Sequence, residues 1–316
     1  MIAVLRPGVL TTVQDAGRRG HRASGMPVAG AADARAFALA NLLAGNAWDA
    51  AALELTLSGG AFRFEREAYV ALGGADLRAT LDGAAVEPWS AFPVPSGGVL
   101  AFRSAADGVR AYLAVHGGID VPPVLGSRST YVRAGVGGFA GRALAGGDRL
   151  PLPAAPAPRL PPRRLPARLV PRSGALRLRV LPGPQDDRFT RDGLATFLGS
   201  AYTVTNRNDR MGYQLEGPSI EHANGADIVS DALLPGAVQV PGNGLPIVLM
   251  ADCQTTGGYP KIAAVIGPDL PALAQARRGA EVRFERCTMA EAVAAVRRER
   301  RRLREAAAAV AGGEAR

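Results

Sequence analysis

The residues best suited to chemistry lie between residues 245 and 262, in a segment that ends just after the chain's single lysine. The chain holds 37 basic residues and 36 of them are arginine, so Lys261 is an exception. Lysine carries a compact ammonium with three rotatable donors, whereas arginine is a rigid fork that always stays charged. We therefore interpret Lys261 as a residue whose amine the site requires. The alternative is a lysine kept by chance in a surface turn.

Hydrogen-bonding side chains precede Lys261 in this segment. Residues 247–250 form a short apolar run, which predicts a buried strand. The pair Gly257-Gly258 lets the backbone adopt conformations that are closed to other residues. The side chains that could position a substrate are Gln254, Thr255, Thr256 and Tyr259. A rigid strand that ends in such a turn is a common way to present binding groups.

Three further polar turns carry hydrogen-bond donors. They span residues 11–15, residues 116–118 together with 126–131, and residues 208–213. Arg128 lies in a Ser-Arg-Ser-Thr run that could bind a carboxylate or a phosphate. A capped, hydrogen-bonded loop explains the same run equally well. Arg210 could bind an anion or pair with Asp209.

Motifs of complete active sites are missing from the sequence. It contains no G-x-x-x-x-G-K-[ST] phosphate loop and no G-x-S-x-G nucleophile turn. The three histidines do not have the spacing of metal ligands, so we expect no metal site. Two cysteines, Cys253 and Cys287, are too few for a disulfide framework. We expect a cytoplasmic protein whose site is incomplete without a partner.

The net charge of +9 raises the question of nucleic-acid binding. Residues 151–172 contribute +5 and residues 288–316 contribute +3, so the rest of the chain is nearly neutral. No basic face studded with aromatic residues occurs, and we expect no nucleic-acid partner. No apolar run reaches 18 residues, which predicts no membrane span. The N-terminus does not read as a signal peptide.

Glycine and proline, at 39 and 24 residues, predict many turns between short strands. Residues 33–43 predict a helix capped by Asp33, and Asp82-Gly83 predicts a hairpin. We expect an N-terminal β domain over 1–150, a spacer over 151–172, a C-terminal β domain over 173–288 and a basic helix or tail over 289–316. The spacer holds eight prolines, which disfavour ladder pairing. Residues 94–119 and 233–258 share a pattern that suggests two copies of one fold.

Seven motifs, taken in order, resemble the biotin-dependent carboxyltransferase family. They are T-T-V-Q-D-A-G-R-R-G, A-Y-L-A-V-H-G-G-I-D-V-P, L-G-S-R-S-T-Y, V-L-P-G-P-Q, D-R-M-G-Y-Q-L-E-G, Q-V-P-G-N-G-L-P-I-V-L-M-A-D and Q-T-T-G-G-Y-P-K-I. The family includes the C subunit of bacterial 5-oxoprolinase (KipA), the second subunit of allophanate hydrolase, and part of urea carboxylase. Asn208 departs from the serine that is common at its position, and Cys253 occupies a variable one.

The resemblance implies a mainly β fold with two cyclophilin-like β-barrel domains, a few short helices and a C-terminal helix. It implies an ATP-dependent 5-oxoprolinase acting on a small amide or lactam. The implied partners are a KipI-like B subunit, with or by which ATP would be bound, and a lactam-opening A subunit. One alternative is a urea carboxylase component, with biotin carried on another chain. A second is a non-catalytic KipA-like regulator of a KipI-like kinase inhibitor.

Within this resemblance, we expect Lys261 to be the catalytic cation that faces a carboxylate, a phosphate or carboxybiotin. The expected substrate-binding residues are Arg128, Arg210, Gln254, Thr255, Thr256 and Tyr259.

Overall fold

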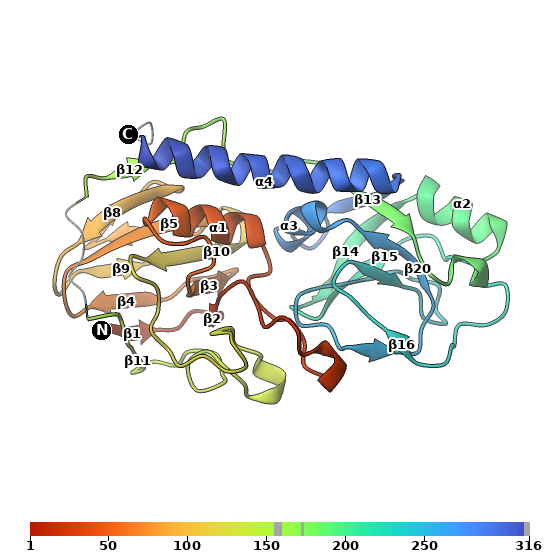
Figure 1. Cartoon of the computed structure of the whole chain (residues 1–316), viewed down its shortest axis with the longest axis horizontal. Coiled ribbons are helices and arrows are strands. Elements are labelled where there is room, and N and C mark those ends of the chain that lie inside the picture. Colours follow the sequence, from red (N-terminus) through yellow and green to blue (C-terminus); the bar gives the residue numbers. More distant parts are fainter. Residues whose placement is uncertain (155–159, 172–173, 313–316) are drawn as a thin grey trace. The chain divides into compact units, whose positions relative to one another are not determined.

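The computed structural model describes residues 1–154, 160–171 and 174–312, and the chain forms two compact units (Figure 1). The described residues of the first unit lie within Met1–Arg18, Ala29–Arg172 and Arg300–Arg316. Those of the second unit lie within Arg19–Val28 and Ser173–Glu299. The short segment Arg19–Val28 therefore belongs with the second unit, although its neighbours in sequence belong to the first.

The first unit contains two six-stranded antiparallel sheets. One has the order β11-β1-β4-β9-β6-β7, formed by β11 (Arg149–Leu150), β1 (Ile2–Arg6), β4 (Ala61–Phe64), β9 (Val99–Ala101), β6 (Thr80–Leu81) and β7 (Ala84–Ala85). The other has the order β12-β8-β5-β10-β3-β2, formed by β12 (Arg163–Arg164), β8 (Ser90–Val94), β5 (Ala68–Asp76), β10 (Asp107–Val115), β3 (Ala52–Thr56) and β2 (Leu10–Gln14). The predicted hairpin is present, with Asp82 and Gly83 between β6 and β7.

Side chains of β5 alternate between the two faces of the second sheet, and both of these faces are buried. Val70 and Leu72 belong to the core that also includes Phe62 and Phe64 of the first sheet. Tyr69 and Ala71 point to the other face and join a second cluster with the helix α1 (Ala34–Leu43). Successive strand residues face opposite sides of a sheet, so one strand serves two cores.

Helix α1 begins and ends close to where the sequence predicts. The Asp33 side chain accepts a hydrogen bond from the Ala36 amide at 2.9 Å, which is the predicted cap. The helix packs closely on β5 because Gly73 has no side chain: a Cβ atom there would lie 3.0 Å from the Ala36 carbonyl oxygen. The prediction of a helix over 33–43 is confirmed.

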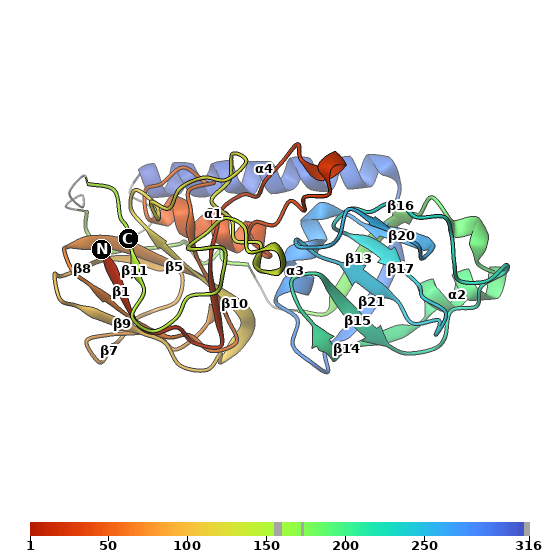
Figure 2. The same cartoon turned by 90° about the horizontal axis from the view of Figure 1, so that it is seen from below.

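The second unit is a closed seven-stranded barrel (Figure 2). Its strand order is β13-β20-β17-β18-β15-β14-β21, formed by β13 (Leu176–Pro182), β20 (Lys261–Val265), β17 (Ala237–Gln239), β18 (Ile247–Leu249), β15 (Gly212–Glu216), β14 (Ala201–Asn208) and β21 (Glu281–Arg286). A parallel pairing of β13 with β21 closes the ring, whereas the other neighbours are antiparallel. The unit also holds a two-stranded sheet, β16 (Asp231–Ala232) with β19 (Thr256–Gly257), and the helices α2 (Arg191–Gly199) and α3 (Leu270–Ala274).

The C-terminal helix α4 (Met289–Ala311) confirms the helix predicted after residue 288. Its residues before Arg300 group with the second unit and the later ones with the first. Val293 and Val296 are 41% and 37% exposed, and small residues such as Ala292 and Ala295 are buried instead. Within the described residues, no helix has both the length and the apolar character to cross a membrane.

The mainly β fold is confirmed. Beside the helices, the described ranges hold four short 3₁₀ turns, Arg22–Ser24, Val132–Ala134, Asp186–Arg188 and Gly267–Asp269. The prediction that the proline-rich stretch lacks ladder pairing is wrong at β12, because two arginines between prolines pair with β8. Residues 155–159 and 172 of that stretch lie outside the described residues. The suggested repeat differs in pairing: β17 and β18 are neighbours, whereas β9 and β10 lie in different sheets.

Candidate functional site

Lys261 is the first residue of β20 and lies opposite Gln239 in the ladder with β17. It is 4% exposed, so the lysine that the composition singles out is buried. A buried ammonium must be paired and hydrogen-bonded to be tolerated. Its partners therefore define the site.

The ammonium of Lys261 has two acceptors on the strand β16. Its Nζ donates to Asp231 Oδ2 at 2.5 Å and to the Ala232 carbonyl oxygen at 2.9 Å. The hydrogen bond from Lys261, together with donors from the Ala232 amide and the Gln185 side chain, lowers the pKa of Asp231 to about 2. Asp231 is thus a carboxylate at neutral pH. Among the described residues, two of the three ammonium donors are engaged, which leaves one for a bound oxygen.

Gln185 completes a small network around this pair. Its Nε2 donates to Asp231 Oδ2 at 3.0 Å, and its Oε1 accepts from the Lys261 amide at 3.2 Å. The backbone approaches closely here because of Gly183, where a Cβ atom would lie 2.0 Å from the Lys261 carbonyl oxygen. Both residues come from the V-L-P-G-P-Q motif, so this motif positions the lysine from a distant part of the sequence.

The other residues predicted around Lys261 lie along the segment before it. Thr256 in β19 pairs with Ala232, whose carbonyl accepts from the lysine. The Thr255 carbonyl accepts from the Leu233 amide at 2.9 Å, which continues the same ladder. Gln254, Thr256 and Tyr259 are exposed, Tyr259 by 42%. The segment therefore places three exposed residues and the β16–β19 sheet close in sequence to the buried ammonium.

Arg210 forms an ion pair within the protein. Its guanidinium donates to both carboxylate oxygens of Asp252, at 2.9 and 2.8 Å, and the two side chains are 6% and 7% exposed. The Asp252 amide also donates to the Arg210 carbonyl at 2.8 Å. This buried fork ties the D-R-M-G turn to the end of β18. In this geometry the charge of Arg210 is matched by the protein's own carboxylate.

Arg128 belongs to the first unit, where the donors of the Ser-Arg-Ser-Thr run converge on Asp15. The hydroxyls of Ser127 and Ser129 donate to Asp15 Oδ1, and the Arg128 amide donates to Asp15 Oδ2 at 2.5 Å. The Arg128 guanidinium donates to the Val121 carbonyl at 2.7 Å and lies 3.5 Å from Asp120. The run thus binds an anion, and that anion is a side chain of the same chain.

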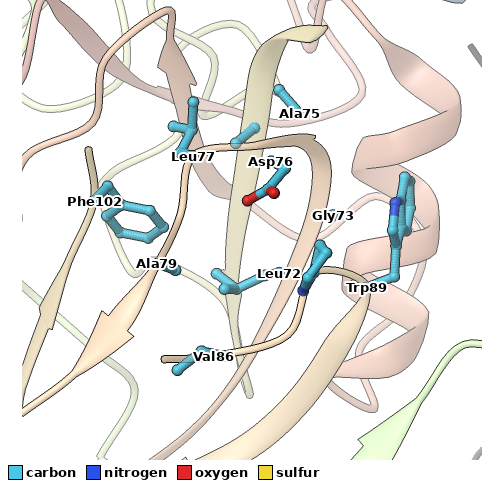
Figure 3. A pocket seen from close by; sticks show the side chains of 11 residues that line it. Leu72, Gly73, Ala75, Asp76, Leu77, Ala79, Val86, Trp89 and Phe102 are labelled. Carbon is cyan, nitrogen blue, oxygen red and sulfur yellow. The ribbon is translucent and has the colours of Figure 1, made fainter. Parts of the chain in front are cut away.

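An apolar cavity in the first unit is too small to hold a substrate. Its volume is about 10 Å³, which is room for about one water molecule. Figure 3 shows Phe102 and Trp89 on opposite sides of it, with the Asp76 carboxylate nearby. The cavity is part of the apolar core, because its lining includes the core residues Leu72, Leu77 and Phe102. Its lining has no cluster of hydrogen-bond donors.

The sequence did not predict the roles of Gln185 and Asp231. It also did not predict that of Arg22, which donates to the carbonyl oxygens of Leu233 and Gln254. Gln185 stands at the end of a quoted motif, and that was the available signal. Nothing in the local sequence marks Asp231, because its role depends on a contact with a residue 30 positions away. The assembled site suits stabilisation of negative charge on a bound oxygen, since a carboxylate and a carbonyl hold the ammonium in place.

Comparison with known proteins defines the class. The pattern of the family described as carboxyltransferase domain, subdomain A and B, matches residues 24–286. The chain therefore belongs to this carboxyltransferase family, which confirms the resemblance of the seven motifs.

Two relatives within this family are similar to the chain over nearly its whole length. The chain is 43% identical over 295 residues to the 5-oxoprolinase C subunit of Escherichia coli K12, a match that covers 93% of this chain and 94% of that protein. It is 38% identical to the 5-oxoprolinase C subunit of Haemophilus influenzae, with 92% and 93% covered.

Solved structures show the same fold within much longer chains. The urea amidolyase of K. lactis matches with a TM-score of 0.91 and 30% identity, covering 96% of this chain and 20% of that one. The Kluyveromyces lactis urea carboxylase matches equally well, with 29% of its chain covered. This chain thus spans 20% to 29% of the length of these fungal enzymes.

Proposed function

We propose that the chain is the C subunit of an ATP-dependent 5-oxoprolinase that converts 5-oxoproline to glutamate together with partner chains. The observation that carries the proposal is the 43% identity to the E. coli protein of that name across more than nine-tenths of both chains. Similarity that extends over both whole lengths, rather than over one domain of a larger enzyme, favours this function over that of the fungal relatives.

The proposal includes partners because the chain offers only part of a site. The sequence has no Walker-type phosphate loop, so we assign ATP to a site bound with or by a KipI-like B subunit. The lactam-opening A subunit would complete the reaction. An ATP-dependent reaction of this kind fits a cytoplasmic heteromer.

In this proposal, Lys261 is the catalytic cation, because its ammonium retains one donor after binding Asp231 and Ala232. That N–H group would donate a hydrogen bond to an oxygen of the lactam substrate as negative charge develops on the oxygen. One preorganised donor of this type contributes about 3 kcal/mol to transition-state stabilisation. The nearby side chains of Gln254, Thr255, Thr256 and Tyr259 would position the substrate.

The two arginines have different proposed roles. Arg210 would act on the substrate through the turn that its ion pair with Asp252 holds in place. Arg128 stays a proposed substrate-binding residue, because its side chain is 40% exposed.

The test is ATP hydrolysis that depends on 5-oxoproline, measured after co-expression of this chain with its KipI-like and lactam-opening partners. We expect Lys261→Met to lower the rate by about 100-fold. Arg177→Met, which removes one exposed charge from the same barrel, serves as the control. A Lys261→Met complex with wild-type activity would contradict the role of the lysine. Full activity of Lys261→Arg would show that the site uses charge and not specifically an ammonium.

A second candidate is carboxyl transfer to urea, favoured by the TM-score of 0.91 with the fungal urea carboxylase. Biotin would then arrive on another chain and meet the same lysine. Urea-dependent ATP hydrolysis in the presence of a biotin carboxylase and a biotin carrier, without a response to 5-oxoproline, would support this candidate. Tight binding of the KipI-like partner with no turnover of either substrate would indicate a regulatory chain.

A further inference from the structure

The segment Arg19–Val28 contributes one arginine to the second unit, next to the sheet that holds Lys261. Arg22 lies in the 3₁₀ turn Arg22–Ser24. Its Nη2 donates to the carbonyl oxygens of Leu233 and Gln254, the latter at 3.2 Å. These two carbonyls belong to segments that are 211 and 232 positions away in sequence. One guanidinium therefore bridges two separate stretches of the barrel unit.

Both stretches lead directly into the β16–β19 sheet. Leu233 follows Ala232, the last residue of β16, and Gln254 precedes Thr256, the first residue of β19. The ladder has two residue pairs and one further backbone hydrogen bond, from the Leu233 amide to the Thr255 carbonyl, and two-stranded sheets of this size are marginally stable alone. A tie across the ends of the two strands is what such a sheet needs to keep its geometry.

The geometry of this sheet determines the position of the ammonium. Asp231 and the Ala232 carbonyl, both in β16, are the acceptors that hold Lys261 Nζ. A shift of β16 relative to β19 would move both acceptors together. In the part of the chain that the structure describes, no hydrogen bond joins Arg22 to Lys261, so its influence on the lysine passes through this sheet.

A buried thiol lies beside the bridge. Cys253, adjacent to Gln254, is 0% exposed, and burial raises the pKa of its thiol, while the guanidinium of Arg22 opposes that shift. Cys253 packs in an apolar cluster with Leu233, whose carbonyl Arg22 holds, so opening of the bridge would uncover this thiol. Cys253 is therefore a natural reporter of whether the tie is closed.

We infer that Arg22 is a positioning residue, which ties the β16–β19 sheet together and thereby fixes Asp231 and the ammonium of Lys261 for the reaction. The catalytic part of this inference rests on the proposed function. Its structural part does not, because the thiol reports on the tie without any substrate.

The first experiment measures alkylation of Cys253 by a thiol reagent in the full chain, with Cys287→Ser as the background. We expect Arg22→Gln to raise the labelling rate by at least about 10-fold and Arg22→Lys to restore much of the protection. Arg19→Gln removes an exposed arginine of the same segment and should leave the rate unchanged. Thermal melts identify any variant that unfolds globally. Equal labelling of Arg22→Gln and the parent would overturn the tie.

The second experiment measures kcat/KM in the reconstituted complex for Arg22→Gln, Asp231→Asn and the double variant. Misplacement of a reacting group by about 1 Å costs up to roughly 100-fold in rate, so we expect a loss of 10- to 100-fold for Arg22→Gln. If Arg22 acts through Asp231, the double variant is little worse than the single ones. Additive losses would overturn the positioning role. A wild-type complex without 5-oxoproline-dependent turnover would instead refute the proposed function, and the labelling result would still decide the tie.

Discussion

Replacing Asp252 with asparagine tests how far the barrel depends on one buried ion pair. The Asp252 carboxylate accepts both hydrogen bonds of the Arg210 fork, and both side chains are almost fully buried. Removing one partner of a buried pair leaves an uncompensated charge and typically costs 3 to 5 kcal/mol. Asparagine keeps the size and one acceptor oxygen, so we expect a loss of about 3 kcal/mol.

The matched control is Glu285→Gln, in the same unit. Glu285 pairs with Arg177 at 2.6 Å, but the side chains are 44% and 63% exposed. Exposed pairs contribute at most about 1 kcal/mol, because water and salt screen them. Both variants neutralise one carboxylate that pairs with an arginine: the Asp252 pair is buried and bidentate, whereas the Glu285 pair is exposed and has one hydrogen bond.

Thermal denaturation followed by circular dichroism provides the assay. A loss of about 3 kcal/mol corresponds to a fall in Tm of roughly 6 to 12 °C for Asp252→Asn. The fall for Glu285→Gln should be under about 4 °C and should disappear in 1 M NaCl, where the Debye length is about 3 Å. Equal shifts for the two variants, or a shift for Asp252→Asn that salt abolishes, would refute the argument from burial.

Three further predictions concern single side chains. The pKa of Asp231 is depressed to about 2, so its stabilising effect is present above pH 4 and is lost as the pH falls towards 2; the difference in stability between wild type and Asp231→Asn should therefore be smaller at pH 3 than at pH 6. The buried Tyr202 hydroxyl has no hydrogen-bond partner in the described residues, so Tyr202→Phe should raise the free energy of unfolding by about 1 kcal/mol. Tyr112→Phe loses a hydrogen bond to the Glu54 carboxylate and should lower the free energy of unfolding. Urea titrations measure both effects. Gly183→Ala should cost about 2 kcal/mol through overpacking, and Gly199→Ala, with open space around it, should cost far less.

Local signals were sufficient for several elements. Asp33 marks the start of α1 because an aspartate cap acts within three residues of itself. The apolar run at 247–250 predicts β18 because it is bounded by turns. Lys261 could be singled out because its residue type is exceptional in this chain. Each of these inferences uses only neighbouring residues or composition.

The contacts that complete the site could not be predicted, because they join distant parts of the sequence. Gln185 reaches the Lys261 backbone across 76 positions, and Arg22 reaches Leu233 across 211. Donor-rich residues in a turn also do not reveal their acceptor: the run around Arg128 has the composition of an anion site, but Asp15 occupies it. Only the folded chain shows which donors are already satisfied.

The buried face of α4 is a further feature that the sequence pattern does not give. Valine is more hydrophobic than alanine, so periodicity alone favours Val293 and Val296 as the buried positions. The structure buries Ala292 and Ala295 instead. Small side chains let a helix backbone approach its neighbour closely, and this steric preference is not visible in a hydrophobicity pattern.

The parallel pairing that closes the barrel joins two strands that the ribosome makes at widely separated times. β13 begins at Leu176, but its neighbour β21 begins only at Glu281. During vectorial synthesis β13 leaves the ribosome with both edges unpaired, because its other neighbour β20 begins only at Lys261. At about 5 to 20 residues per second, the edge that pairs with β21 stays open for several seconds. The unpaired N–H and C=O groups of a strand edge pair with those of other chains, which leads to aggregation. Ribosome-bound chains stalled before residue 281 should therefore be the aggregation-prone species, and the demand for chaperones should end once β21 emerges.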